Sequence, residues 1–198
     1  MQLKAPAIVL AARPHGENAV ILRALTQEAG LVAAYVAGGQ GRRLRPVVIP
    51  GNMVEADIRA RSASQLPFGK VELVTSRAPW LGEPLPAAAI LWVTALTATA
   101  LPERNPYPSL YDALGGLLDA ICHAPSARGW APALLSYEAL LLRELGYGGA
   151  KPAPADLLQT IEAMRSLGPA LDRYLLADRH GDAMEARTRL IDRLSRIV

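Results

Sequence analysis

The chain has few residues that could build a covalent or metal-held framework. It has one cysteine, Cys122, and three histidines that lie far apart, His15, His123 and His180. A single cysteine excludes an intrachain disulfide and a four-cysteine zinc site, and it fits a reducing compartment. We therefore expect no metal and no cofactor. Cys122 follows Ile121 on the apolar side of a predicted helix, so we expect a buried, unreactive thiol.

Long hydrophobic runs are also lacking. The longest, residues 87–101, has 15 residues and contains three threonines, whereas a membrane-spanning helix needs about 20. The opening MQLKAPAIVLAARPHGE has too short an apolar run for a signal peptide, because Arg13 follows it at once. The sequence predicts a soluble, cytoplasmic protein without a membrane partner, and a buried helix at 87–101.

Motifs of nucleotide binding and catalysis are missing. The only Gly-Lys pair, at 69–70, is not followed by Ser or Thr, so there is no P-loop. Residues 39–44 begin like a dinucleotide fingerprint but place leucine where the third glycine should stand. No G-x-S-x-G, H-E-x-x-H or P-C-x-x-C occurs. We expect no enzyme activity, and an uncharacterised enzyme is the weakest alternative.

Positive charge is present but unevenly distributed. The net charge is +3. Residues 1–80 hold ten Lys or Arg against five Asp or Glu, whereas residues 81–198 hold eleven against thirteen. Such asymmetry indicates either an anionic partner for the first part or a weakly basic surface without a partner. The stretch AGGQGRRLRP, residues 37–46, lies in the middle of the basic part.

Short apolar runs separated by turn residues indicate a β domain in residues 1–80. Five such runs span 7–13, 19–26, 31–38, 53–62 and 70–76. The run 53–62 alternates, as a half-buried strand does. One face of that run has Met53, Glu55, Asp57, Arg59 and Arg61, and the other has Val54, Ala56, Ile58 and Ala60. Five strands with basic loops favour an OB-fold barrel.

Ala- and Leu-rich segments with helical spacing follow, and they predict a helical domain in residues 81–198. The expected helices lie near 86–101, 107–122, 131–145, 155–167, 169–178 and 183–197. In the last of these, we expect Met184, Ile191, Leu194 and Val198 on one side, and Arg187, Arg189, Arg193 and Arg196 facing solvent or a partner. The predicted fold class is mixed β + α, a five-stranded OB-fold barrel followed by an α-helical domain.

The basic residues of the β domain are the candidate site. A Gly-rich loop can bend around a phosphodiester chain while arginines on strands follow it, and such binding tolerates sequence and is sensitive to salt. A flexible, solvated loop without a ligand is the alternative. The candidate DNA-binding residues are Arg13, Arg42, Arg43, Arg45, Arg59, Arg61 and Lys70.

Several segments, in order along the chain, resemble the RecO family of bacterial DNA repair proteins. They are IVLAARPHGE, LTQEAG, RRLRPVVIPGN, ALPERNPYPSLYDALGGLLDAI and YEALLLRELGYG. The resemblance implies an N-terminal OB-fold and a helical domain, binding of single- and double-stranded DNA, and annealing of complementary strands. It also implies action with RecR in loading recombinase onto strands coated by single-stranded DNA-binding protein (SSB), recognition of the acidic SSB tail, and a nucleoid-associated location.

The resemblance ends in a difference after the LGYG segment. Many family members continue there into a cysteine-bearing insertion, which in some binds zinc. Here Gly148 is followed by GAKPAPADLLQ, which has no cysteine. The resemblance therefore implies no zinc in this chain.

Three arginines of the helical domain are candidates for partner binding, namely Arg143, Arg189 and Arg193. An acidic tail with an apolar tip needs a groove between helices with arginine at its rim. An ordinary solvated helix face is the alternative. A second class of function also stays open, an adaptor whose basic OB surface binds an acidic protein and has no direct role on DNA.

Overall fold

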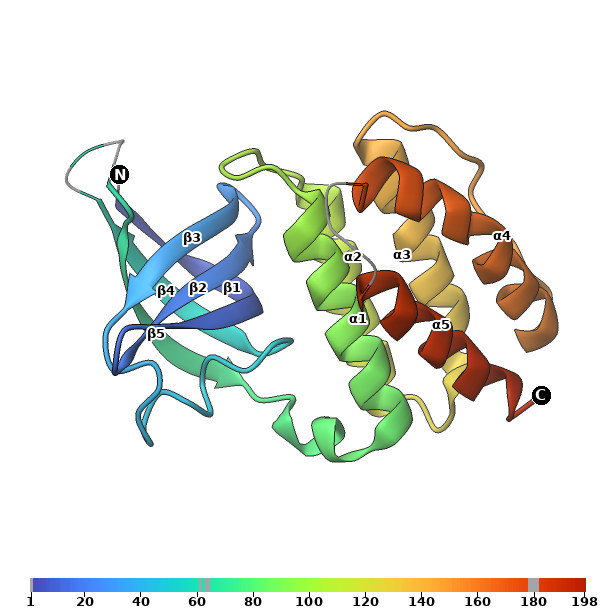
Figure 1. The fold of residues 1–198 in the computed structure, drawn as a ribbon, viewed down its shortest axis with the longest axis horizontal. Helices are drawn as coiled ribbons and strands as arrows, with labels where there is room; N and C mark the ends of the chain where they lie inside the picture. Colours follow the sequence, from blue (N-terminus) through green and yellow to red (C-terminus); the bar gives the residue numbers. More distant parts are fainter. Residues whose placement is uncertain (1, 61, 63–64, 178–181) are drawn as a thin grey trace. The chain divides into compact units, whose positions relative to one another are not determined.

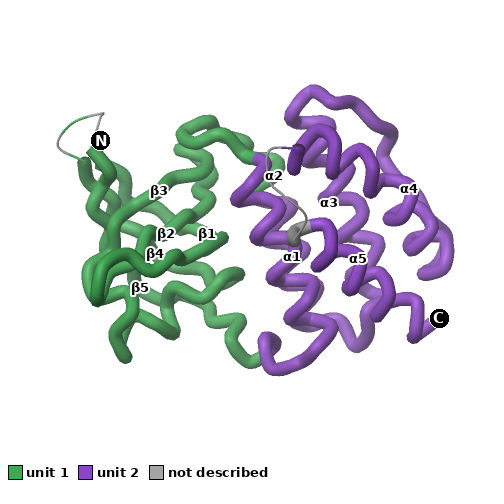
Figure 2. The backbone as a smooth tube through the Cα atoms, in the orientation of Figure 1, with its two compact units in different colours: residues 1–79, 101–111 green, residues 80–100, 112–198 purple. Residues whose placement is uncertain are grey.

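The computed structural model describes residues 2–60, 62, 65–177 and 182–198. The chain divides into two compact units, residues 1–79 with 101–111 and residues 80–100 with 112–198 (Figure 2). The first unit thus includes a segment that follows a helix of the second unit in the sequence.

The first unit is a five-stranded barrel (Figure 1). Its strands are β1 (Gln2–His15), β2 (Ala19–Thr26), β3 (Gly30–Val36), β4 (Met53–Arg59) and β5 (Phe68–Thr75). The barrel is closed in the order β1-β2-β3-β5-β4. Closure depends on β1, whose 14 residues bend at a register shift between Val9 and Ala11, so that one end pairs with β4 and the other with β2. The predicted OB-fold barrel is confirmed.

Alternation along the strands separates the barrel interior from its outer face. In β4, Val54, Ala56 and Ile58 are buried, while the residues between them are partly exposed. This confirms the predicted faces for residues 53–59. Arg61, which the sequence analysis placed on the same outer face, lies outside the described residues.

The second unit is helical and ends the chain. Its elements are a 3-10 turn at Ala78–Gly82, α1 (Pro84–Ala100), α2 (Pro108–His123), a 3-10 turn at Ala127–Gly129, α3 (Ala131–Glu144), α4 (Leu157–Leu175) and α5 (Asp182–Ser195). Both the first 3-10 turn and α2 cross the limits of the two units. Cys122 is buried as expected. None of the helices in the described ranges is long and apolar enough to cross a membrane.

The two helices predicted at 155–167 and 169–178 are wrong, because α4 runs through both. Pro169 lies inside this helix. A proline normally disfavours helical backbone in the residue before it by crowding that residue's Cβ. Here the preceding residue is Gly168, which has no Cβ, and Met164 and Leu171 are fully buried on either side. Packing on both sides therefore holds one continuous helix.

The prediction that Arg187 faces solvent or a partner is also wrong. Its side chain is only 2% exposed and forms a buried ion pair with Glu138 on α3. Arg187 Nε donates to Glu138 Oε1 at 2.9 Å and Nη2 donates to Oε2 at 2.7 Å. Trp92 Nε1 on α1 donates to the same carboxylate at 2.8 Å, and Arg187 Nη2 also donates to the Met164 carbonyl on α4. One buried carboxylate thus joins α1, α3 and α5, and its arginine reaches α4.

The buried face of α5 differs in one further respect from the expected one. Ile191 and Leu194 are buried as predicted, and Leu190 joins them, but Val198 is 60% exposed. The helix ends at Ser195, so helical spacing no longer applies to Val198.

On α3, next to Glu138, burial raises the pKa of Tyr137, whose hydroxyl lies 2.7 Å from that of Thr97.

Candidate nucleic-acid interface

The loop that connects β3 to β4 is held, near its start, against the turn between β1 and β2. Gln40 Nε2 donates to the carbonyls of Gly16 (3.1 Å) and Ala19 (2.9 Å), and its backbone N–H donates to Asn18. Three hydrogen bonds from one residue therefore fix the Gly-rich stretch against the end of the β1–β2 hairpin.

Two glycines of this loop, Gly38 and Gly39, are required by its backbone geometry. Gly38 has φ +70°, a backbone conformation that costs other residues about 1–2 kcal/mol. A Cβ on Gly39 would lie 2.5 Å from Val20 Cγ2. The first glycine allows the turn, and the second lets the loop backbone approach β2 closely.

The far end of the loop is also held. Asn52 is fully buried, and its Nδ2 donates to the carbonyls of Pro46 (2.9 Å) and Val47 (3.1 Å). Its Oδ1 accepts from the backbone N–H of Arg77 at 2.8 Å. Between the two ends, Val47 and Val48 belong to the barrel core, and Leu44 packs against it. These contacts order the loop backbone, so its arginines project from a fixed base.

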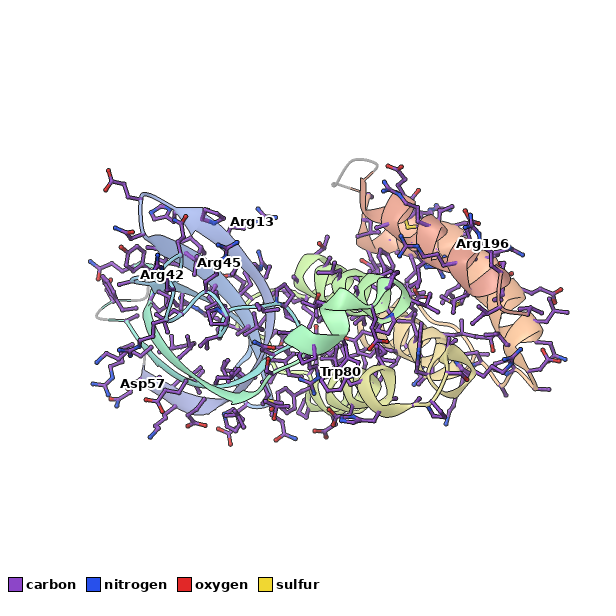
Figure 3. The ribbon with its side chains drawn as sticks, turned by 90° about the horizontal axis from the view of Figure 1, so that it is seen from below. Arg13, Arg42, Arg45, Asp57, Trp80 and Arg196 are labelled. Atoms are coloured by element: carbon purple, nitrogen blue, oxygen red, sulfur yellow. The ribbon has the colours of Figure 1, made fainter. Side chains whose placement is uncertain are left out.

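The loop arginines and Arg13 form what we call the basic cluster, defined as Arg13, Arg42, Arg43 and Arg45. All four are exposed, and none makes an ion pair within the described part of the chain. Arg13 lies on β1 close to the turn that Gln40 binds. Figure 3 draws Arg13, Arg45 and Arg42 along one side of the barrel and Asp57 on another. Exposed cations that are not paired with a carboxylate produce a positive surface.

The other predicted DNA contacts lie in a surface of mixed charge. Arg59 Nε and Nη2 donate to both carboxylate oxygens of Asp57, at 2.9 and 2.8 Å. Asp57 also stands between Lys4 and Lys70 in the strand register. The hydrogen bonds from Arg59 lower the pKa of Asp57 against a smaller desolvation effect, and the charges of Arg59 and both lysines add to the shift. Arg59 and Lys70 therefore face an ionised carboxylate, and much of their charge is compensated.

Aromatic side chains on the outer face of the barrel were missed by the sequence analysis. The ring centroids of His15 and Tyr35 lie 5.9 Å apart, and those of Tyr35 and Phe68 lie 5.3 Å apart. We call these three residues the aromatic row. The predicted strand began at Lys70 and so excluded Phe68. Extending the alternation of Lys70 and Glu72 by one step would have placed Phe68 on the outer face.

The candidate partner residues separate into two grooves of the helical unit. Arg189 and Arg193 line a groove of about 490 Å³ between α1 and α5, together with Leu91 and Trp92. Leu91 is 49% exposed there. Arg143 instead lines a groove of about 440 Å³ with side chains of α2 and α3 and with Lys151. The three predicted residues do not form one site.

A metal centre finds no support in the described ranges. They contain no group of three or more His, Cys, Asp or Glu side chains that could hold a metal ion. His180 lies outside those ranges. The expectation that the protein needs no metal stays a prediction.

Two family models match the chain, one in each half of the RecO family's length. A family model described as the N-terminal part of recombination protein O matches residues 1–77, and one described as its C-terminal part matches residues 84–149. The two models thus cover the barrel strands and the helices through α3. Neither reaches α4 or α5, and α5 contributes Arg187 and one side of the α1–α5 groove.

Individual proteins show the same relationship. The chain is 35% identical to the DNA repair protein RecO of Rhodospirillum centenum, in an alignment of 234 positions that covers 94% of this chain and 92% of that protein. Because the alignment is longer than this chain, the relative has residues that the chain lacks. Identity to the RecO proteins of Paracoccus denitrificans and Phenylobacterium zucineum is 42% and 40%, over 75% of this chain and 60% of each relative. The chain therefore belongs to the family of the DNA repair protein RecO.

Proposed function

We propose that this protein is a non-enzymatic mediator of DNA repair and recombination that binds single- and double-stranded DNA through the basic cluster. The observation that carries the proposal is the set of exposed arginines without ion-pair partners in the described chain, held on an ordered loop at the end of the β1–β2 hairpin. Phosphate contacts supply most of the sequence-independent affinity for DNA. Arginines that neutralise two backbones at once also oppose the repulsion between strands, so the same surface supports strand annealing.

The basic cluster suits this role better than the strand residues do. A phosphate that approaches Arg59 must compete with Asp57, which already accepts both hydrogen bonds of the guanidinium fork. A phosphate that approaches Arg42, Arg43 or Arg45 meets no such competitor among the described residues. We therefore propose the loop arginines and Arg13 as the principal contacts, and Arg59 and Lys70 as secondary ones.

Replacing Arg42, Arg43 and Arg45 by alanine is expected to weaken binding to oligonucleotides of every sequence. Three lost phosphate contacts should reduce the slope of log affinity against log salt by about 2 for a single strand. Fluorescence anisotropy with a labelled oligonucleotide, titrated at several salt concentrations, measures both quantities.

The matched control removes the same charge from the helical unit, with Arg165, Arg173 and Arg196 replaced by alanine. All three are exposed. Equal losses in the two triple variants would show that net charge alone matters and would refute the loop as the contact. Two results together would favour the adaptor function instead. They are displacement of the labelled oligonucleotide by an acidic peptide, and equal binding of that oligonucleotide by wild type and the loop variant.

We further propose that the α1–α5 groove binds the acidic, apolar-tipped tail of SSB, and that this interaction, together with RecR, directs the protein to SSB-coated strands for recombinase loading. Exposed Leu91 offers an apolar surface in the groove, and Arg189 and Arg193 supply charge at its edge. Arg189 forms an exposed ion pair with Glu185 on the same helix. Such pairs contribute little and can exchange partners.

Replacing Arg189 and Arg193 by glutamate is expected to weaken binding of a labelled tail peptide at least about tenfold, because two attractive charges become repulsive. Isothermal titration or anisotropy measures the affinity. Arg143→Glu provides the comparison, since it alters the groove at α2 and α3 and leaves the α1–α5 groove intact. If Arg143→Glu abolished binding while the double variant bound normally, the tail site would lie at α2 and α3.

A further inference from the structure

Among the described residues of the barrel, the most exposed large apolar side chain is that of Phe68, the chain's only phenylalanine. Phe68 is 67% exposed, although the barrel has a fully formed core. Its backbone is fixed at the start of β5, because the carbonyl of the preceding Pro67 accepts the backbone N–H of Tyr35 at 2.7 Å. Phe68 is thus presented to solvent from a fixed strand position.

The strand register places Phe68 in a row of side chains that crosses the sheet. Arg13 on β1 pairs with Ile21 on β2, which pairs with Tyr35 on β3, which pairs with Phe68 on β5. Phe68 in turn pairs with Arg59 on β4. Side chains directly opposite in register lie on the same face of a sheet. This register row, Arg13–Ile21–Tyr35–Phe68–Arg59, therefore has an arginine at each end, and it contains two residues of the aromatic row, Tyr35 and Phe68.

The connections beside the row are those that OB-folds use for ligands. His15 ends β1 just before the β1–β2 turn, and Phe68 begins β5 just after the β4–β5 connection. The OB-fold binds oligonucleotides on the face of strands 2 and 3 and on these two connections. Tyr35 lies on β3 between them, in edge-to-face contact with both other rings.

We propose that the aromatic row is a stacking platform for unpaired bases, which gives the barrel a subsite specific for single-stranded nucleic acid. The inference rests on the proposed DNA binding and adds a subsite to it. Arginines bind phosphate, and aromatic faces stack on any base, since every base has a π face. The bases of an intact duplex are stacked on one another and cannot lie on Phe68 and Tyr35, so the platform distinguishes single strands from duplexes.

The charges around the rings favour a single strand over an apolar protein surface as the ligand. An apolar protein surface would place the exposed guanidinium of Arg13 against uncharged groups, whereas a single strand has a phosphate between each two successive nucleotides. The basic cluster continues the positive surface beyond Arg13, through the loop that Gln40 fixes to the same hairpin. A single strand satisfies both the rings and the charges.

The test replaces Phe68 by alanine and measures binding to three ligands of about 15 nucleotides, a length suited to one OB-fold. The ligands are a thymidine oligonucleotide, an abasic oligonucleotide with the same backbone, and a duplex. Affinity for the thymidine oligonucleotide is expected to fall about 5- to 150-fold, the range for losing one stacked base. Affinities for the abasic strand and the duplex, and the salt slope for all three, are expected to stay unchanged.

Two variants serve as controls. Phe68→Trp keeps an aromatic face and is expected to retain affinity for thymidine. It also adds a fluorophore to the barrel, where the described chain has no tryptophan, and stacking should quench it. Val74→Ala truncates another exposed apolar side chain of the same strand, 60% exposed, and should leave all three affinities unchanged.

The outcomes distinguish the platform from the DNA binding on which it rests. If wild type bound none of the three ligands, the proposed function itself would be refuted. If wild type bound all three and Phe68→Ala bound thymidine equally well, only the platform would be refuted. The platform would also be refuted if Phe68→Ala lost equal affinity for the thymidine oligonucleotide and the abasic strand. It would be refuted as well if Phe68→Ala lost affinity for an acidic peptide but kept its affinity for the thymidine oligonucleotide.

Discussion

Replacing Arg187 by methionine is expected to lower the free energy of unfolding by about 3–5 kcal/mol, because it leaves a buried carboxylate without its counter-ion. Glu138 is fully buried and accepts two hydrogen bonds from Arg187. Methionine can fill much of the space but donates no hydrogen bond. The remaining donor to Glu138, Trp92 Nε1, is neutral. Urea denaturation followed by circular dichroism measures the loss.

A second substitution separates the unpaired charge from lost packing. Adding Glu138→Gln to Arg187→Met removes the charge, while the new amide oxygen can still accept from Trp92. We expect the double variant to be more stable than Arg187→Met alone. Arg189→Met, two residues along the same helix, should change stability by no more than about 0.5 kcal/mol because its side chain is 64% exposed. A double variant less stable than Arg187→Met would contradict the electrostatic explanation.

Replacing Gly30 by alanine is expected to destabilise the barrel unit by about 3 kcal/mol, through backbone strain and a lost contact. Gly30 has φ +67°, and an added Cβ would lie 1.9 Å from the carbonyl oxygen of Asn105. The segment 101–111 would have to move. That segment is held to β3 by the hydrogen bond from the N–H of Arg104 to the Leu31 carbonyl, at 2.8 Å.

Gly16 provides a matched control for this prediction. It has φ +59°, but no atom lies within 4 Å of the position that its Cβ would take. Gly16→Ala should therefore cost only the backbone strain, about 1–2 kcal/mol. Denaturation curves of the two variants give the difference. Equal losses at the two positions would show that Asn105 yields without cost, and would refute the contact as a source of stability.

Features with a regular period were predictable from the sequence. Buried Val54, Ala56 and Ile58 alternate with polar residues, so a single strand sufficed to indicate one solvated face. The barrel and the helical segments followed from such patterns, together with the turn residues between them. The spacing of apolar residues is a property of residues that are close in the sequence, and strands and helices form from the same residues.

Features that depend on partners distant in sequence were not predictable in this way. Arg187 looked like a surface residue because its burial requires Glu138, which precedes it by almost fifty residues. The pairing of Arg59 with Asp57 was equally hidden, although both lie on one strand, because a short spacing alone does not tell whether two side chains turn toward each other. For the candidate site this means that the sequence indicated which cations are exposed but not which of them are already compensated.

The pairing of β1 with β4 also has a consequence for the order in which the barrel forms. Gln2 is opposite Arg59 and Lys4 is opposite Asp57, so closing the barrel joins strands separated by about fifty residues. Long loops cost more entropy to close, and proteins rich in such distant contacts fold more slowly than helical ones. The β1–β2, β2–β3 and β4–β5 hairpins are local and can form early. We expect barrel closure to be the slow step, so that Arg13, Ile21 and Tyr35 on the first three strands meet Phe68 and Arg59 on the last two only when the barrel closes.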